Sequence, residues 1–331
     1  MKLLSVWLLS LSCFIMVAAN AQQTDAEKRI AKSLKNIEKK AEKGDMKLQN
    51  WLADYYYSKE TKQGYEKAVY WWTKAAEQGN AEAQYYLGRS FAYAQGVPED
   101  YATAVCWWKL AAQQGHAEAQ SELADCFYMG KGVLKDINTA VHWWQEAAAQ
   151  GDMIALFSLG NSYEKGEGQD KDMNQAVLCY EKIANASVHT DDPLEQSLDG
   201  LYKYLANLRL ASIYGLGKDG FKKDVPKACR ILEGMIDKYA NAQVLLGEIY
   251  YQDGTNGTLG SYEKAVKYFT MAREDDSEET SGAAAFFLSK CYRFGRGVPQ
   301  DVAKADELQR AALEKGWDEA KSLEELLESL D

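Results

Sequence analysis

Residues 81–115 read AEAQYYLGRSFAYAQGVPEDYATAVCWWKLAAQQG, and the pattern of this stretch returns along the chain with a step of 36 residues. The step connects Gly79, Gly115 and Gly151. Three further series share it: Ala68, Ala104, Ala140 and Ala176; Trp72, Trp108, Trp144 and Tyr180; and Leu87, Leu123 and Leu159. A fixed period of this size is typical of a solenoid built from one repeated supersecondary unit. Such folds usually display a long binding surface rather than a catalytic pocket.

Within this stretch the residue pattern predicts two antiparallel helices. Apolar residues recur at helical spacing over 81–94, which predicts the first helix. The glycine and proline of 95–98 end that helix, and Asp100 is placed to cap the second one. Gly115 follows the second helix, where a left-handed backbone costs glycine nothing. We expect the alanines and Gly88 to mark the points where helix axes approach closely.

The same pattern continues along most of the chain and predicts an all-α solenoid of about seven helix pairs. We place the units at about 45–79, 80–115, 116–151, 152–187, 204–239, 240–276 and 282–316. A polar insertion at 187–203 interrupts the period. The amphipathic segments 22–44 and 317–331 are predicted to be capping helices, which cover the terminal apolar faces of a solenoid.

The repeated string Ala-x-Ala-Gln-x-x-Leu-Gly-x-x-Phe, followed by Gly-Val-Pro-x-Asp, Ala-x-x-Trp-Trp and Ala-Ala-x-x-Gly, resembles the Sel1-like repeat family. This family is related to the TPR solenoids. The resemblance covers about residues 45–316, although units one, five and six depart from the pattern through loop shortening or insertion. It implies a right-handed superhelix that binds proteins or peptides, often as an adaptor.

The resemblance also indicates where a partner would bind, because the first helices line the concave groove in TPR-like solenoids. The candidate residues are first-helix positions that vary between units and point away from the Leu-Phe face: Tyr85, Tyr86, Arg89, Ser121, Glu122, Asp125, Phe157, Ser158 and Asn161. Tyrosine and arginine are typical interface anchors. The alternative is a set of scattered surface residues, since single exposed aromatics are common.

The N-terminus predicts export. Lys2, an apolar run and the small-x-small end at Ala19-Asn20-Ala21 are typical of a secretory signal peptide over 1–21. An uncleaved anchor is the alternative. We expect a periplasmic or secreted protein that is not inserted in a membrane once the signal is removed. The net charge of −11 argues against nucleic acid as a partner.

Five cysteines follow the predicted signal peptide, and an odd number leaves at least one thiol free or paired between chains. Cys106 and Cys126 lie nearly symmetrically about the turn at Gly115, so antiparallel helices would bring them close. They are the candidate disulfide. The alternative is five small buried hydrophobic side chains.

The motifs that could carry catalysis are weak, and we predict no catalytic residue, cofactor or metal site. The Gly-x-Gly-x-x-Gly pattern of 215–220 follows a predicted helix, whereas a dinucleotide site requires a strand there. Ser162-x-x-Lys165 and Ser261-x-x-Lys264 match one serine β-lactamase motif, but the companion motifs are absent. The three histidines lack the spacing of zinc ligands. An envelope hydrolase of the β-lactamase-labelled kind is the enzymatic alternative.

Three Trp-Trp doublets raise a further alternative, a module that binds glycans or cell-wall fragments. The second tryptophan of each doublet lies on the alanine face of its helix and is predicted to be core. The first, at Trp71, Trp107 or Trp143, is one position further round and could be partly exposed. Core packing of both members is the favoured interpretation, because aromatic side chains supply much of the buried area.

Overall fold

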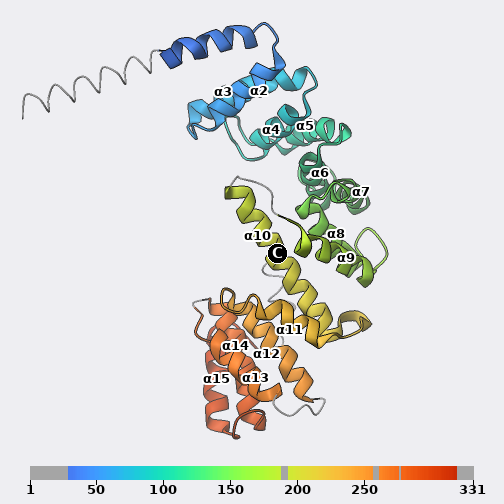
Figure 1. Cartoon of the computed structure of the whole chain (residues 1–331), viewed down its shortest axis with the longest axis vertical. Helices are drawn as coiled ribbons and strands as arrows, with labels where there is room; N and C mark the ends of the chain where they lie inside the picture. The colour runs from blue at the N-terminus through green and yellow to red at the C-terminus, as the bar shows by residue number, and fades with distance from the viewer. Residues whose placement is uncertain (1–28, 188–192, 256–260, 276, 319–331) are drawn as a thin grey trace, which may run out of the picture. The chain divides into compact units, whose positions relative to one another are not determined.

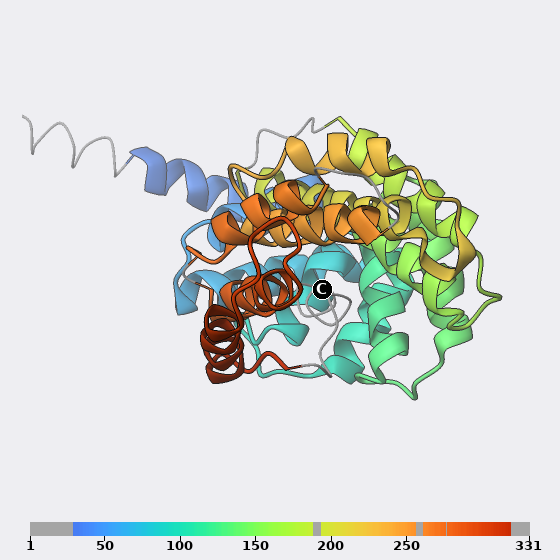
Figure 2. The ribbon, with the colours of Figure 1, turned by 90° about the horizontal axis from the view of Figure 1, so that it is seen from below.

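The computed structural model describes residues 29–187, 193–255, 261–275 and 277–318 (Figure 1). Over these residues the chain consists of helices joined by short turns, without a strand (Figures 1 and 2). The predicted signal peptide lies outside the described residues, and so does nearly all of the predicted C-terminal cap. No helix in the described ranges is long and apolar enough to cross a membrane.

A helix over 29–41 comes first. The helices after it are α2 (Met46–Tyr57), α3 (Lys62–Glu77), α4 (Ala81–Ala92), α5 (Tyr101–Gln113), α6 (Ala117–Met129), α7 (Ile137–Ala149), α8 (Met153–Lys165), α9 (Met173–Asn185), α10 (Pro193–Ser212), the π-helical turn η1 (Ile213–Gly217), the 3₁₀ turn η2 (Lys218–Gly220), α11 (Val225–Glu233), α12 (Ala240–Thr255), α13 (Ser261–Ala272), α14 (Glu278–Phe294) and α15 (Val302–Glu314). Consecutive helices pack as hairpins, for example α2 with α3, α4 with α5, α8 with α9, α12 with α13 and α14 with α15.

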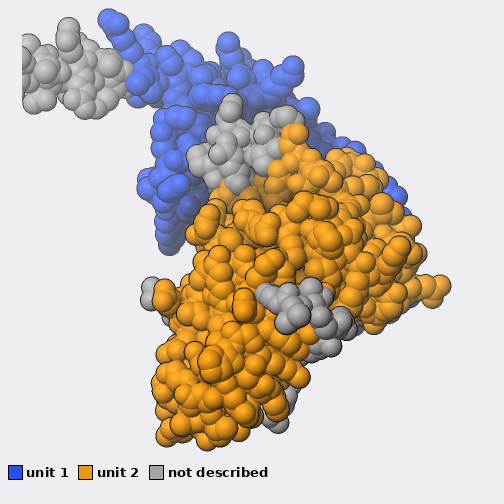
Figure 3. Space-filling model, turned by 60° about the horizontal axis from the view of Figure 1, so that its bottom comes forward, with its two compact units in different colours: residues 1–147 blue, residues 148–331 orange. Residues whose placement is uncertain are grey.

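The contacts divide the chain into two compact units, residues 1–147 and 148–331, which are coloured separately in Figure 3. Each unit has its own buried core. The buried side chains of the first unit include those of the α2–α3 and α4–α5 hairpins. Those of the second unit include residues of the α8–α9 hairpin and of the hairpins from α12 onward.

Helix ends follow the local chemistry that the sequence predicted. The Asp100 carboxylate accepts a hydrogen bond from the backbone N–H of Thr103 at 3.1 Å, so it caps α5. Gly115 has φ of +88°, the left-handed conformation expected after the second helix. The helix α4 ends at Ala92 rather than at residue 94, because Ala94 already has a left-handed φ of 55°. The same type of N-cap recurs at Asp45, Asn80, Asp152, Asp172, Asp224 and Asp301.

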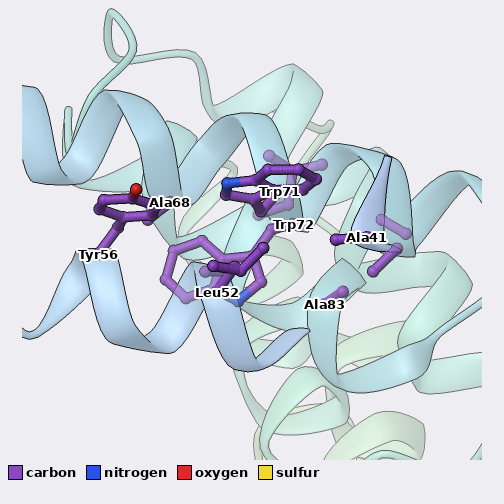
Figure 4. Packing of buried hydrophobic residues seen from close by; sticks show 11 residues of the cluster. Ala41, Leu52, Tyr56, Ala68, Trp71, Trp72 and Ala83 are labelled. Carbon is purple, nitrogen blue, oxygen red and sulfur yellow. The ribbon is translucent and has the colours of Figure 1, made fainter. Parts of the chain in front are cut away.

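In the core of the first hairpin, alanine, leucine and tryptophan side chains pack against one another (Figure 4). Leu52 and Tyr56 of α2 point toward Ala68 and the two tryptophans of α3, and all are buried. Trp72 is 1% exposed. The small alanines let the helices approach, and the large rings fill the volume that remains.

In the first three repeats, a glutamine near the start of the first helix donates a hydrogen bond to the end of the helix before it. The Gln84 side-chain N–H donates to the carbonyl of Ala76 at 3.1 Å, and Gln120 makes the same bond to Ala112. This explains the Gln in the Ala-x-Ala-Gln string. A helix leaves its last carbonyls without intrahelical partners, and the next first helix supplies the donor.

The helix over 29–41 covers the first hairpin. Ala41 is fully buried, and Leu34 and Ile37 pack against the α2–α3 core. The Tyr56 hydroxyl donates to Glu38 at 2.5 Å, and the Tyr70 hydroxyl donates to Glu42 at 2.6 Å. This segment falls within the predicted cap at 22–44, and its contacts are those expected of a cap.

The fifth repeat differs from the sequence prediction. The insertion assigned to 187–203 includes a helix, since α10 runs without a break from Pro193 into the repeat. Proline at the first helical position already has the required φ and needs no N–H partner. The helix then widens into the π-helical turn η1 before α11 begins.

Candidate partner-binding surface

The first helix of the second repeat carries three of the candidate residues, and they differ in what they contact. Tyr86 stacks on Trp72, with ring centroids 5.1 Å apart and planes at 11°. Tyr85 stacks on His116 at 4.8 Å, and its backbone carbonyl accepts from Trp108 Nε1 at 3.1 Å. Both rings are half-buried. Tyr86 therefore belongs to the packing between the first two repeats.

Arg89 is the third candidate on α4, and its guanidinium lies against two tyrosine rings. Its Cζ is 5.8 Å from the centroid of Tyr85 and 5.7 Å from that of Tyr93, within cation–π range. It makes no hydrogen bond and no ion pair with any residue that the structure describes, and its Nε is buried without a partner. Burial, together with the nearby Glu122 carboxylate, raises the pKa of Tyr93 to about 12.

The candidates on α6 are only partly available. Ser121 is buried. Glu122 and Asp125 are half-buried, and the Asp125 carboxylate accepts a hydrogen bond from Trp144 Nε1 at 2.9 Å. That bond ties the first helix of the third repeat to its second helix, so Asp125 has a structural role in its own repeat.

The candidates on α8 require a correction. Phe157 is 5% exposed and packs against the rings of Tyr180 and Tyr202, so it is a core residue rather than a surface one. Asn161 is half-buried and accepts from the Tyr180 hydroxyl at 2.7 Å. The sequence interpretation missed both contacts because they depend on helices that lie 19 or more positions away in the chain.

One register position repeats along the first helices, two residues after the recurring leucine. We call it the inner row, and its members are Asp54, Arg89, Asp125, Asn161, Ser212, Glu248 and Lys290. In the sixth repeat, Glu248 Oε1 accepts from Gln252 at 3.2 Å, whereas Oε2 is buried without a partner among the described residues. Burial raises the pKa of the Glu248 carboxyl. The period of the sequence would have identified this position, but not which members lack partners.

A buried ionic cluster joins the fourth and fifth repeats. The Glu164 carboxylate on α8 lies 2.5 Å from Lys218 Nζ and accepts from the Tyr180 hydroxyl at 2.9 Å. Arg209 on α10 is 3.9 Å from the same carboxylate, and both residues are almost fully buried. Lys218 and Arg209 both lie beside the Glu164 carboxylate, so these charges interact with one another inside the second unit. We therefore regard the cluster as part of the packing of that unit.

The recurring pattern is matched by a family model described as the Sel1 repeat. The match extends over residues 47–80, 81–116, 117–152, 154–188, 205–233, 240–277 and 282–315. The chain belongs to the Sel1 repeat family. Sel1 repeat proteins are generally protein-interaction scaffolds and mostly lack enzymatic activity.

Solved structures share the Sel1 repeat fold. A Sel1 repeat protein from Oxalobacter formigenes is 22% identical, with a TM-score of 0.57, and the match covers 83% of this chain and 99% of that one. The protective antigen c5321 of uropathogenic Escherichia coli, which displays an SLR fold, is 25% identical over 86% of this chain and 80% of that one, with a TM-score of 0.45. No curated protein sequence matches the chain.

The serine motifs of this Sel1 repeat chain have structural roles. The Ser162 hydroxyl is buried and donates to the carbonyl of Glu167. The Ser261 hydroxyl donates to Asp253 at 2.6 Å, and Lys264 lies over the ring of Tyr250. Both serine hydroxyls are therefore engaged in hydrogen bonds within the fold.

The glycine-rich motif lies in a turn between two helices. Gly215 lies in η1, where an added Cβ would be 2.3 Å from Ile249 Cδ1, and the Lys218 ammonium is paired with Glu164. The motif therefore forms the turn between α10 and α11. Over the described ranges, no group of three or more histidine, cysteine, aspartate or glutamate residues could hold a metal ion.

The first tryptophans of the three doublets differ in their exposure. Trp71 is 4% exposed, which corrects the expectation that it could be partly exposed. Trp107 and Trp143 are half-buried. Trp107 packs against the core of the first hairpin, and Trp143 against that of the α4–α5 hairpin.

The candidate disulfide is not formed in the structure, where both cysteines are free thiols. Cys106 is exposed on α5, whereas Cys126 is buried in α6 and packs in the α4–α5 core. Burial raises the pKa of Cys126 to about 12, which keeps it protonated and unreactive. The helices are antiparallel as expected, but the two side chains occupy different environments.

Proposed function

We propose that this Sel1 repeat protein binds a protein or peptide partner through the first-helix surface of its first unit and that it acts after export. The observation that supports the binding surface is the set of half-buried tyrosines and charged residues on α4 and α6, with Arg89 unpartnered among them. Arginine and tyrosine in partly buried positions contribute large contact area with few rotatable bonds. The basic and apolar pattern of residues 1–21 supports the proposal of export.

The binding proposal is tested by proximity crosslinking of the mature protein in its native envelope. The test variant combines Arg89→Glu with Tyr93→Ala, since Tyr93 is half exposed and Tyr86 is engaged in packing. The matched control is Lys109→Glu, the same charge reversal at an exposed position on the second helix of that repeat. We expect a discrete partner that disappears in the test variant and remains in the control.

If the same partners persist in the test variant, the first-helix surface of α4 is not the binding site. Export is tested separately by N-terminal sequencing of the protein from the envelope fraction. A start at residue 22 supports cleavage after Ala21, and an intact N-terminus on protein that is confined to the cytoplasm contradicts export.

A further inference from the structure

The unpartnered Arg89 guanidinium is the most unusual polar group of the first unit. Arg89 as a whole is half-buried, but its Nε is buried and has no hydrogen-bond partner among the described residues, while Tyr85 and Tyr93 lie against the guanidinium at 5.8 and 5.7 Å. Buried polar groups in native proteins are nearly always hydrogen-bonded, so an exception calls for an explanation. Leaving a buried donor unsatisfied costs about 1–3 kcal/mol, and more when it is charged.

The chemistry of the group indicates what would satisfy it. A guanidinium presents five N–H donors in a planar fork that matches the two oxygens of a carboxylate or of a phosphate. The two tyrosine rings hold the fork in place and offer apolar surface to the chain that carries the oxyanion. The site is therefore suited to a planar or tetrahedral oxyanion that is attached to a larger ligand.

The neighbouring charges favour a carboxylate over a phosphate. Glu122 on α6 interacts electrostatically with Arg89 and with both flanking tyrosines, although it forms no hydrogen bond with the guanidinium. A ligand with one negative charge meets less repulsion from Glu122 than a phosphate, which carries nearly two at neutral pH. Overall, the protein has a net charge of −11, which further disfavours dianions.

We propose that Arg89 takes a carboxylate of a peptide partner, held between Tyr85 and Tyr93. This rests on the partner-binding function proposed above and specifies the chemistry of the partner. The carboxylate comes either from an aspartate or glutamate side chain or from a peptide C-terminus, and both present the same two oxygens to the fork.

The test uses the full mature protein, immobilised, with N-acetylated random octapeptide pools read by mass spectrometry. Four pools either include or omit Asp and Glu and end either in a free acid or in an amide. We expect wild type to retain the pool without any carboxylate about tenfold less than the best-retained pool, which corresponds to 1.4 kcal/mol. Retention of the free-acid pool that omits Asp and Glu identifies the C-terminus as the source, and retention of the amidated acidic pool identifies the side chain.

The variants separate a binding role from a structural one. Arg89→Gln is expected to lose the preference for carboxylates, and Arg89→Lys to keep only part of it, because the ammonium lacks the planar fork. Lys109→Gln is the matched control and should keep the full preference for carboxylates. Arg89→Gln is also expected to melt no lower than wild type, since the charge that it removes is half-buried and has no hydrogen bond or ion pair with any described residue to offset its desolvation. A lower melting temperature together with an unchanged preference would show that Arg89 is structural.

The remaining outcomes distinguish the two proposals. If wild type retains the carboxylate-free pool as well as the others, and Tyr93→Ala loses that retention, peptide binding stands and the carboxylate assignment is overturned. Stronger retention of an amidated pool containing phosphoserine overturns it in favour of phosphate. If wild type retains no pool at all, both the peptide-binding function and the role of Arg89 are contradicted.

Discussion

Three glycines lie where a second-helix ring crosses the first helix of its own repeat. A Cβ added at Gly88 would lie 2.5 Å from Trp108 Nε1, one at Gly160 would lie 2.6 Å from Tyr180, and one at Gly247 would lie 2.5 Å from Phe269. Real Cβ atoms do not approach other heavy atoms so closely, so each ring requires glycine at its crossing point.

The first prediction concerns this crossing. Gly88→Ala is expected to lower the free energy of unfolding by about 1–3 kcal/mol, because the Trp108 indole has to move out of a close-packed position. The matched control is Gly200→Ala in α10, where nothing lies within 4 Å, and alanine there should stabilise the helix by up to about 1 kcal/mol. Urea denaturation measures both. Equal effects of the two substitutions would contradict the crossing argument.

The second residue-scale prediction concerns Glu248, whose carboxyl pKa is raised above 4.5 by burial, with Lys290 opposing the shift. The folded state therefore holds a proton that the unfolded state releases as the pH rises past 4.5. Stability from this group is present below that pH and is lost as the pH rises through the folded-state value. Glutamine has no carboxyl group to ionise, so Glu248→Gln avoids the loss of stability that ionisation causes. The substitution should therefore stabilise the protein near pH 7 by about 1 kcal/mol or more.

Thermal melts of wild type and Glu248→Gln at pH 4 and pH 7 measure this effect. The gain of the variant should be present at pH 7 and small at pH 4. Glu263→Gln is a suitable control, since Glu263 is an exposed carboxylate in the neighbouring helix α13. An equal gain at both pH values would assign the effect to the shape of the glutamine rather than to the buried charge.

At the scale of elements, the repeats are joined end to end by glutamines as well as by apolar packing. Gln84 donates to the last turn of α3 and accepts from Gln114 at 2.8 Å at the end of α5. Gln49 makes the equivalent pair of bonds, to Ala41 and from Gln78. One buried side chain therefore contacts the ends of two successive second helices.

The third prediction follows from this bridge. Gln84→Ala should lower the free energy of unfolding by about 1–3 kcal/mol, because it removes two hydrogen bonds of a buried side chain, one to the Ala76 carbonyl and one from the Gln114 amide. Chemical denaturation of the single variants and of Gln84→Ala with Gln114→Ala completes a double-mutant cycle. The effects should be non-additive. Strict additivity would mean that the two glutamines contribute independently.

Helix boundaries show which elements could be predicted from local pattern. Asp100, Gly115 and the loop at 95–98 act over one turn of backbone, so the start and end of α5 followed from the sequence. The course of α10 did not, because a polar segment with Gly200 inside it has no helical apolar pattern of its own. Its continuation from Pro193 into the fifth repeat depends on tertiary contacts with α9 and α11.

At the scale of the whole molecule, each repeat within a compact unit packs mainly on its sequence neighbours, so stability should be the sum of local terms. Leu87→Ala is expected to remove about 2–5 kcal/mol from the repeats around it, since Leu87 is 1% exposed in the first core. Hydrogen exchange should then rise in α2 to α5 and remain unchanged in α14 and α15. A uniform rise along the chain would show instead that the protein unfolds as one cooperative unit.

The sequence alone determined that this protein is an all-α repeat of helix pairs and that it belongs with the Sel1 repeats. It could do so because helical spacing, caps and turn glycines act within a few residues, and the repetition of the pattern confirms each of them. Only the tertiary structure decided which first-helix residues are available to a partner. Tyr86 stacks on Trp72, and Phe157 packs against Tyr180. The Asp125 carboxylate accepts a hydrogen bond from Trp144. Arg89 makes no hydrogen bond or ion pair with any described residue, and that depends on contacts between segments that local pattern does not describe.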